Sequence, residues 1–347
     1  MLASQPDTIC VVRLSAIGDT CHALAVVRRL QDNWPGSKIT WIIGRTEAAL
    51  MAGIEGVEFI IFDKSAGLSA YRDIRRQLKG RSFDVALCMH ASMRANILYP
   101  LIDSPLRLGF DKSRARDFQW LFTNKRIPVG EREHAMEAMM GFATATGAQE
   151  TPLRWDIPVG DEDRAIADDL ASQHGRLAVI SPCTSNRARN FRNWPADRFV
   201  HIAHFLEQRG LHVVLTGGPT DVEQRYGTEI AAACRATNLI GKTSLKQLIA
   251  VFAAAELVIC PDSGPAHMAT AAGVPVVGLY ATSNPDRTGP YLSRQWVANR
   301  YPDALRQYLG FDVDEVRWGQ RVRNPDAMAM ISVDDVAQKI DDLLSEA

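Results

Sequence analysis

The segment from residue 260 to residue 280 places two titratable side chains where a phosphate could be bound. An apolar run that ends at residue 260 predicts a buried strand, and the turn Asp262-Ser263-Gly264 then opens a helix of small residues. Free N–H groups and the dipole at that helix start favour an anion, and His267 would lie in the first turn. A strand, helix and strand crossover without a ligand explains the same pattern. Two titratable groups at the carboxyl end of a parallel strand favour a binding site.

A second strand, glycine-bearing loop and helix begins near the N-terminus. It contains Gly18 and Asp19 and matches neither the GxGxxG pattern nor the GK[ST] of a P-loop. Gly18 would let a substrate approach the loop closely. Asp19 is interpreted either as a helix-capping acid or as a carboxylate that faces a cleft between domains and acts as a general base.

Two loops in the second half of the chain also suit a diphosphate. The first follows a predicted strand and carries hydroxyl groups and arginines, namely Thr184, Ser185, Arg187, Arg189 and Arg192. Guanidinium groups could clamp phosphoryl oxygens, although a solvated basic loop has the same composition. The second loop precedes Glu223, which either reaches ribose hydroxyls or complements a helix dipole as a first-turn acid.

Short apolar strands alternate with helical segments throughout, which predicts an α/β protein with two doubly wound, parallel-sheet domains. The expected strands are residues 8–14, 38–43, 59–62 and 84–89 in the first half, and 177–181, 212–216, 238–240, 257–260 and 276–280 in the second. We place the interdomain linker at residues 149–160, where prolines interrupt the pattern.

Composition excludes several classes of protein. The 347 residues carry a formal net charge of −1, which argues against a general nucleic-acid binder. The six cysteines are scattered and lie mostly in or beside apolar runs, which indicates buried free thiols in a reducing compartment. No secretory leader or membrane-spanning run is present, so we expect a cytoplasmic protein that could still touch a membrane surface.

Taken together, four elements resemble glycosyltransferase family 9, the ADP-heptose:lipopolysaccharide heptosyltransferases. In chain order they are RLSAIGD at residues 13–19, RNWP at 192–195, GGP at 217–219, and DSGPAH followed by GVPVV within 262–277. The last of these is the most specific, and the resemblance covers nearly the whole chain.

The resemblance implies a GT-B fold of two Rossmann-like domains that face a central cleft. Residues 1–155 would bind the acceptor, residues 156–330 would bind the nucleotide sugar, and the last helix, at 331–347, would cross back to the first domain. It also implies an inverting enzyme without metal or cofactor that moves heptose from ADP-heptose to a lipopolysaccharide inner-core acceptor, Kdo-lipid A or a heptosyl core. Asp19 would be the base. The residues implied for the donor are Thr184, Ser185, Arg192, Glu223, Thr243, Asp262, Ser263, Gly264 and His267.

Positively charged residues of the first half indicate where the acceptor would bind. The residues expected to bind the acceptor are Gly18, Arg72, Arg75, Arg76, Arg94 and Arg116. Three of the arginines recur at i, i+3, i+4 spacing on one predicted helix face, and together the cations would suit a phosphorylated, lipid-linked glycan at the inner membrane face. A solvated charged surface explains each of them singly. No nucleic-acid partner is expected.

Two features depart from the family pattern. The usual lysine before W-P is Arg192, and the loop before it is longer than usual, so that Arg187 or Arg189 could share its role. The alternatives are a GT-B transferase with another nucleotide sugar or acceptor, a sugar-nucleotide epimerase, and a non-catalytic nucleotide-binding paralogue. The presence of Asp19 argues against the last. Residues 293–323 show no pattern that indicates a function.

Overall fold

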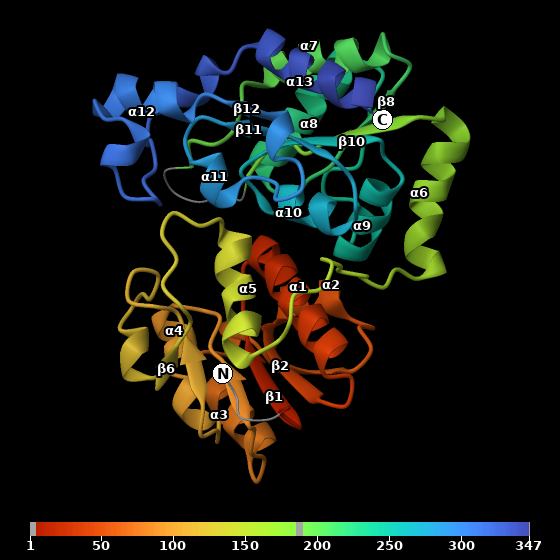
Figure 1. Ribbon diagram of the computed structural model, residues 1–347. Coiled ribbons are helices and arrows are strands. Elements are labelled where there is room, and N and C mark those ends of the chain that lie inside the picture. The colour runs from red at the N-terminus through yellow and green to blue at the C-terminus, as the bar shows by residue number, and fades with distance from the viewer. Residues whose placement is uncertain (1–4, 185–189, 347) are drawn as a thin grey trace. The chain divides into compact units, whose positions relative to one another are not determined.

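The protein is described here by a computed structural model that covers residues 5–184 and 190–346. The chain divides into two compact units, Met1–Pro158 and Val159–Ala347, and each contains its own six-stranded sheet (Figure 1). All strand pairs in both sheets are parallel. The predicted α/β class with two doubly wound sheets is confirmed.

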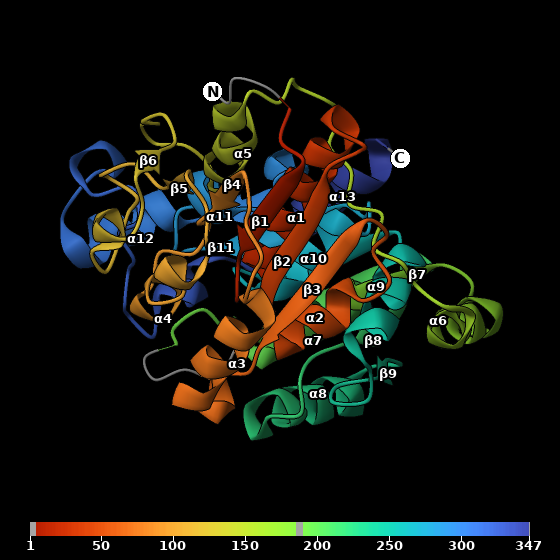
Figure 2. The same cartoon turned by 90° about the horizontal axis from the view of Figure 1, so that it is seen from below.

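Unit 1 has the strand order β3-β2-β1-β4-β5-β6. Its strands are β1 (Thr8–Val12), β2 (Lys38–Gly44), β3 (Val57–Phe62), β4 (Val85–Leu87), β5 (Arg107–Gly109) and β6 (Lys125–Arg126). Its helices are α1 (Ile17–Asn33), α2 (Arg45–Met51), α3 (Leu68–Leu78), α4 (Met93–Asn96) and α5 (Ala135–Thr146), with 3-10 turns η1 (Lys64–Ala66), η2 (Tyr99–Leu101) and η3 (Gln119–Leu121). Figure 2 shows β1, β2 and β3 side by side.

The centre of unit 1 is built from strands without an exposed face. Four of the five residues of β1 are buried, and β1 lies between β2 and β4, as expected for a parallel strand covered by helices on both sides. Trp41 of β2 is fully buried, and its indole Nε1 donates to the Arg13 carbonyl oxygen at 3.2 Å. This packing fixes the carboxyl end of β1, from which α1 begins.

Unit 2 has the strand order β12-β11-β10-β7-β8-β9. Its strands are β7 (Leu177–Ile180), β8 (His212–Leu215), β9 (Thr237–Asn238), β10 (Leu257–Pro261), β11 (Val276–Tyr280) and β12 (Val297–Asn299). Its helices are α6 (Asp161–His174), α7 (Ala196–Glu207), α8 (Asp221–Ala233), α9 (Leu245–Ala253), α10 (Gly264–Ala271), α11 (Pro285–Thr288), α12 (Tyr301–Leu309) and α13 (Val333–Glu346), with 3-10 turns η4 (Arg294–Trp296), η5 (Val313–Glu315) and η6 (Ala327–Met330).

The last helix belongs to the core of unit 2. Val336, Ile340 and Leu343 of α13 are buried in the cluster that also contains Trp194, and α13 contacts α7, β11 and β12. The indole of Trp194 donates to the Ile331 carbonyl oxygen at 3.0 Å, just before α13 begins. That this helix also reaches the first domain stays a prediction.

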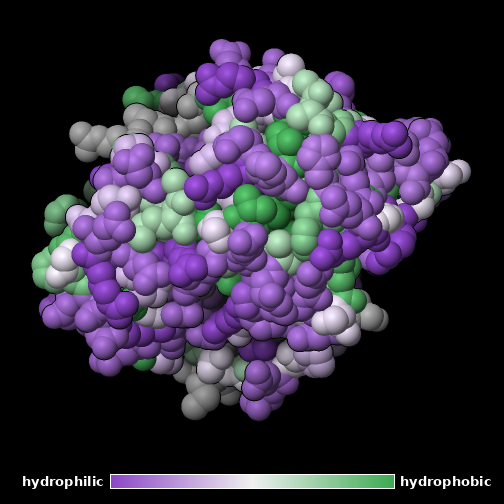
Figure 3. All heavy atoms as spheres, turned by 90° about the horizontal axis from the view of Figure 1, so that it is seen from above, coloured by the Kyte–Doolittle hydropathy of each residue, from purple (hydrophilic) through white to green (hydrophobic). Residues whose placement is uncertain are grey.

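Figure 3 shows the face seen from above, which is mostly hydrophilic with small apolar groups.

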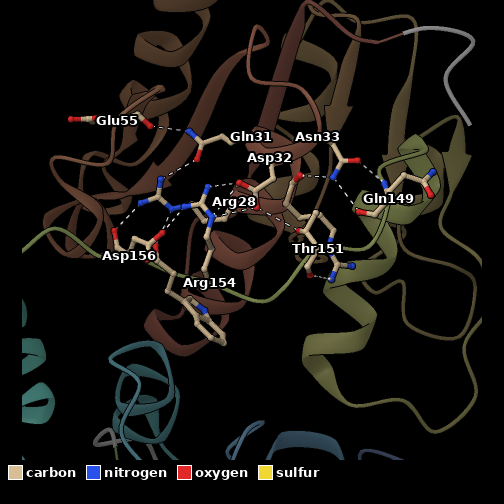
Figure 4. A network of polar contacts seen from close by, with 11 residues as sticks. Arg28, Gln31, Asp32, Asn33, Glu55, Gln149, Thr151, Arg154 and Asp156 are labelled. Carbon is tan, nitrogen blue, oxygen red and sulfur yellow. Dashed lines mark hydrogen bonds and ion pairs between the residues drawn. The ribbon is translucent and has the colours of Figure 1, made fainter.

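The segment expected as a linker is fastened to α1 before the chain enters unit 2 (Figure 4). Arg28 donates from Nε to the Trp155 carbonyl oxygen at 3.0 Å and from Nη2 to the Asp156 carbonyl oxygen at 2.8 Å. Arg154 forms an ion pair with Asp32 of the same helix at 2.5 Å. Residues 149–158 are therefore a strap on unit 1, and the compact units separate after Pro158, three residues later than the expected boundary.

Candidate active site

The candidate donor residues of unit 2 gather at one edge of its sheet. Strands β8, β7, β10 and β11 are consecutive in the sheet, and the register pairs Ile259 with Ile180 and Pro261 with Leu279. Because these strands are parallel, the residues that follow them leave the sheet at the same edge. Thr184 follows β7 and Asp262 follows β10, so the structure brings together two segments that are far apart in the sequence.

Helix α10 begins at this edge without a side-chain cap. Ser263 occupies the N-cap position with extended backbone, and its hydroxyl makes no capping hydrogen bond. Gly264 and Pro265 form the first turn, and His267 follows within it, partly buried. An uncapped helix start presents backbone N–H donors and a positive dipole end, which is an anion-binding arrangement.

Arg192 is held at the start of α10 by the residue before the cap. Its Nη1 donates to the Asp262 carbonyl oxygen at 2.8 Å and lies 3.6 Å from Asp262 Oδ2. Asn190 Oδ1 accepts from the Arg192 backbone N–H at 3.3 Å and from Nε at 3.4 Å. The Asp262 side chain is only 8% exposed. The positive charge is thus fixed beside the helix start, where a diphosphate would need it. Ser185, Arg187 and Arg189 lie outside the described residues.

A second guanidinium reaches the same carboxylate, and the sequence had not suggested it. Arg321 Nη2 lies 3.9 Å from Asp262 Oδ2, and the neighbouring Val322 N–H donates to the Thr282 carbonyl oxygen at 3.0 Å. Residues 293–323, which had no interpretation, therefore contribute a cation to the site. No periodic pattern marks Arg321, and the tertiary contacts of its neighbours Gln320 and Val322 bring it there.

Thr184 is oriented by an asparagine of the RNWP element. Asn193 Oδ1 accepts from the Thr184 backbone N–H at 2.9 Å and from its hydroxyl at 3.3 Å. Thr184 is almost fully buried. Asn193 is therefore a positioning residue. It lies within the RNWP element, but the sequence analysis gave it no role. The asparagine links the β7 loop to the segment that carries Arg192.

Glu223 has both carboxylate oxygens engaged by its own loop. Oε1 accepts from the Gly218 N–H at 2.7 Å and Oε2 accepts from the Thr220 hydroxyl at 2.6 Å. A Cβ on Gly218 would lie 3.1 Å from Oε2 and would crowd the carboxylate. Glu223 shapes the loop after β8, and its contact with a ribose stays a prediction. Thr243 is partly exposed in the turn before α9, and its contact with the donor also stays a prediction.

Asp19 of unit 1 forms an ion pair with Arg13. The Arg13 side chain is 10% exposed and the Asp19 side chain 40% exposed, so the carboxylate is held by a buried guanidinium and remains partly exposed to solvent. Arg13 Nη1 donates to the Met89 carbonyl oxygen at 2.7 Å, which ties the end of β1 to the end of β4. Gly18 is buried in the first turn of α1. An oriented carboxylate that a substrate can reach is suited to accept a proton.

His90 lies beside this pair and is held neutral. Its Nδ1 accepts from the Leu14 N–H at 3.2 Å, which places the ring proton on Nε2. Burial, followed by the charge of Arg13, lowers the pKa of His90 from 6.5 to about 4. The ring therefore adds no positive charge next to Asp19 at neutral pH.

The cations expected to bind the acceptor are exposed on neighbouring elements of unit 1. Arg72, Arg75 and Arg76 lie on α3. The Tyr71 hydroxyl, also on α3, donates to the Arg94 carbonyl oxygen at 3.1 Å and so joins α3 to α4. The Asn96 amide of α4 donates to the Arg116 carbonyl oxygen at 3.4 Å. These contacts place the backbones of the three segments beside one another.

The two doubly wound sheets, one followed by an uncapped helix start and the other by an accessible carboxylate, match the GT-B fold of solved glycosyltransferases. Residues 71–319 match the family described as Glycosyltransferase family 9 (heptosyltransferase). The chain is 35% identical over 338 residues to the lipopolysaccharide core heptosyltransferase OpsX of Haemophilus influenzae, covering 97% of this chain and 96% of that protein. The chain belongs to glycosyltransferase family 9 and is an enzyme of that class.

More distant relatives share the fold over the whole chain. Lipopolysaccharide heptosyltransferase 1 of Escherichia coli K12 is 24% identical and covers 83% of this chain and 92% of its own. The crystal structure of a family 9 glycosyltransferase from Veillonella parvula has a TM-score of 0.78 at 24% identity and covers 98% of both chains. E. coli heptosyltransferase WaaC with ADP has a TM-score of 0.75 at 19% identity and covers 97% of this chain and 99% of that one.

Over residues 5–184 and 190–346, no group of three or more His, Cys, Asp or Glu side chains is arranged to hold a metal ion. Within the same ranges, no helix has the length and apolarity needed to cross a bilayer.

Proposed function

We propose that the protein transfers heptose from ADP-heptose to a lipopolysaccharide inner-core acceptor, Kdo-lipid A or a heptosyl core, with inversion and without a metal ion. The observation that carries this proposal is the start of α10, which has no side-chain cap and has Arg192 fixed beside Asp262. The names of the relatives, which are lipopolysaccharide heptosyltransferases, support the choice of sugar and acceptor.

In the proposed mechanism, unit 2 binds the donor. The diphosphate lies at the start of α10, against Ser263, Gly264 and His267, with Arg192 paired to its oxygens. Negative charge grows on the leaving phosphate as the bond from the anomeric carbon to oxygen breaks, and N–H donors and a fixed cation stabilise that charge. Thr184 and Asp262 complete the site for the diphosphate and the sugar, and Glu223 and Thr243 lie towards the nucleoside.

Unit 1 supplies the acceptor and the base. The acceptor hydroxyl oxygen attacks the anomeric carbon from the face opposite the leaving group, its proton passes to Asp19, and ADP leaves. Arg13 holds the carboxylate in one orientation, so that its basic oxygen is fixed in position to accept the proton of the acceptor hydroxyl. Gly18 gives close access, and Arg72, Arg75, Arg76, Arg94 and Arg116 pair with phosphates of the acceptor. We place this reaction at the cytoplasmic face of the inner membrane, where a lipid-linked acceptor would be.

The test is a reconstituted transfer reaction. Purified protein is incubated with Kdo-lipid A or with a heptosylated core acceptor and, in separate arms, with ADP-heptose, ADP-glucose or UDP-glucose. We expect the acceptor mass to rise by one heptose residue only with ADP-heptose, and NMR of the product to show the inverted anomeric configuration. Transfer from another nucleotide sugar alone would replace the donor assignment. Tight ADP binding with no transfer to either acceptor would favour a non-catalytic paralogue.

A further inference from the structure

An exposed apolar cluster lies on unit 1 next to Arg94 and Arg116, which the proposed function assigns to the acceptor. It consists of Met93, Ile97, Phe118, Trp120 and Leu121, whose exposed fractions run from 41% to 62%. Isolated exposed apolar residues are ordinary, but a group of large ones marks an interaction surface. Figures 1 and 2 both place α4 on the side of unit 1 where β6 lies.

Two segments form this cluster, and polar contacts join them. The Asn96 amide of α4 donates to the Asp117 carbonyl oxygen at 2.7 Å, and Asp117 Oδ2 accepts from the Met93 N–H at 2.9 Å. Helix α4 and the turn before η3 are therefore adjacent. This contact brings the exposed apolar residues of both segments to the same part of unit 1.

The turn that displays Phe118 is built to hold it outward. Asp117 and Phe118 have left-handed backbone, with φ of 51° and 59°, which is uncommon for residues with bulky side chains. Gln119 is fully buried between them and Trp120: its Oε1 accepts from the Phe110 N–H at 3.1 Å and its Nε2 donates to the Cys88 carbonyl oxygen at 2.8 Å. These buried hydrogen bonds hold the turn from inside, while the apolar groups on either side of Gln119 stay exposed.

The surroundings of the cluster are positively charged. Residues 93–126 contain seven Lys and Arg, three Asp and no Glu, whereas the whole chain has a net charge of −1. Asp111 is buried and paired with Arg114. The exposed cations of this stretch are Arg94, Lys112, Arg116, Lys125 and Arg126.

We propose that this cluster and its surrounding cations dock the protein on an anionic lipid bilayer. Aromatic side chains at the headgroup level, shallow insertion of apolar groups and basic residues that pair with anionic headgroups are the components of peripheral membrane binding. A protein interface would favour an apolar centre depleted of charge, and here cations intersperse the apolar groups. The inference rests on the proposed function only in that a lipid-linked acceptor would lie in the same bilayer.

Vesicle sedimentation tests the docking surface. The probes are vesicles of phosphatidylcholine alone and of phosphatidylcholine with phosphatidylglycerol, each at low and high salt. We expect the full-length protein to bind only the anionic vesicles, and less at high salt. The triple variant Phe118→Ser, Trp120→Ser, Leu121→Ser should bind roughly tenfold more weakly or worse. The matched control Leu309→Ser, Phe311→Ser alters exposed apolar residues of unit 2 and should bind like the wild type.

A conservative variant guards against misfolding of the triple variant. Trp120→Phe keeps the apolar surface, so it should fold and bind, but the blue shift of tryptophan emission on adding anionic vesicles should shrink relative to the wild type. Equal vesicle binding by the triple variant and the wild type would overturn the proposal. So would a failure of the wild type to bind anionic vesicles, or a wild-type dimer that the triple variant converts to a monomer, since a second copy would then be the occupant.

Transfer to a deacylated, water-soluble acceptor separates this inference from the proposed function. We expect the triple variant to keep wild-type turnover on that acceptor and to lose turnover on the lipid-linked acceptor in vesicles. Vesicle binding by a wild type that transfers nothing would count against the function alone. Transfer without any vesicle binding would count against the docking surface alone.

Discussion

Arg192 and Asp262 meet twice: the Arg192 guanidinium donates to the Asp262 carbonyl oxygen at 2.8 Å and faces its carboxylate at 3.6 Å. Arg192 lies in the segment after β7 and Asp262 directly follows β10. Their contact joins these two segments at the edge of the sheet where α10 begins. A cation that is already desolvated and held by a buried carboxylate loses little freedom when it pairs with a phosphate. The site is therefore organised before the donor binds.

Arg192→Ala should weaken ADP binding and lower turnover together. Loss of one charge-assisted phosphate contact costs roughly 1.5–3 kcal/mol, or about 10- to 150-fold in affinity. Arg192→Lys should restore much of both, since a lysine keeps the charge. Calorimetric titration with ADP measures the affinity. The matched control is Arg323→Ala, an exposed arginine of the same unit. Wild-type affinity in folded Arg192→Ala would remove Arg192 as the clamp. A loss in Arg187→Ala or Arg189→Ala would then assign the clamp to that residue, and small, equal losses in all three would favour a solvated loop.

Arg321→Ala should have a smaller effect of the same kind. Its guanidinium is 3.9 Å from Asp262 Oδ2 and its side chain is 46% exposed, so solvent screens the interaction. We expect ADP affinity to fall by up to about fivefold, the range of exposed ion pairs. Titration at low and high salt measures it, and the difference from wild type should narrow at high salt. An unchanged affinity at low salt would remove Arg321 from the donor site.

Asp19→Asn should abolish most turnover and leave donor binding intact. The amide keeps the shape of the side chain but cannot take a proton, and general-base catalysis contributes roughly 100-fold or more. Initial rates with ADP-heptose and calorimetry with ADP separate the two effects. Glu55→Gln removes an exposed carboxylate of the same unit and should behave like the wild type. A folded Asp19→Asn enzyme with near-normal rates would mean that another group is the base.

Removal of divalent metal ions should not change ADP binding. The helix start and Arg192 supply the positive field that a metal would otherwise provide. The measurement is calorimetry with ADP in EDTA and in magnesium. Binding that disappears in EDTA and returns with magnesium would show that the donor is held through a metal.

Stability should fall between pH 7 and pH 5 because of His90. The pKa of His90 is about 4 in the folded protein, against 6.5 as its ordinary value, owing first to burial and then to Arg13. Between those two values the unfolded chain takes up a proton that the folded protein does not, so its stability is full above pH 6.5 and is lost as the pH falls towards 4. The loss from this group between pH 7 and pH 5 is about 2 kcal/mol.

His90→Asn isolates that contribution. The asparagine oxygen can replace Nδ1 as the acceptor for the Leu14 N–H, and it does not titrate. Urea unfolding at pH 7 and pH 5 should show a smaller loss of free energy of unfolding for the variant than for the wild type. Equal losses in both proteins would assign the acid sensitivity to other groups.

The strand, turn and helix segments that carry the site could be predicted from the sequence because their signals are local. Apolar runs of strand length ended by glycine, proline and polar turn residues placed Asp19 in the first turn of α1 and Asp262 and Ser263 at the start of α10, as the structure has them. The strands β5, β6 and β12 were not predicted. They are two or three residues long, have no period of their own, and exist because a neighbouring strand pairs with them.

The α/β class, the phosphate-type helix start and the carboxylate could be predicted from local sequence, because each depends on residues within about one strand and helix. Which groups meet them depends on how distant segments fold together. Arg321 reaches Asp262 from a segment without periodicity, His90 is neutral because of what buries it, and Glu223 is engaged by its own loop rather than open. Burial and the charge of distant neighbours decide these properties, and no short-range pattern in a sequence encodes them.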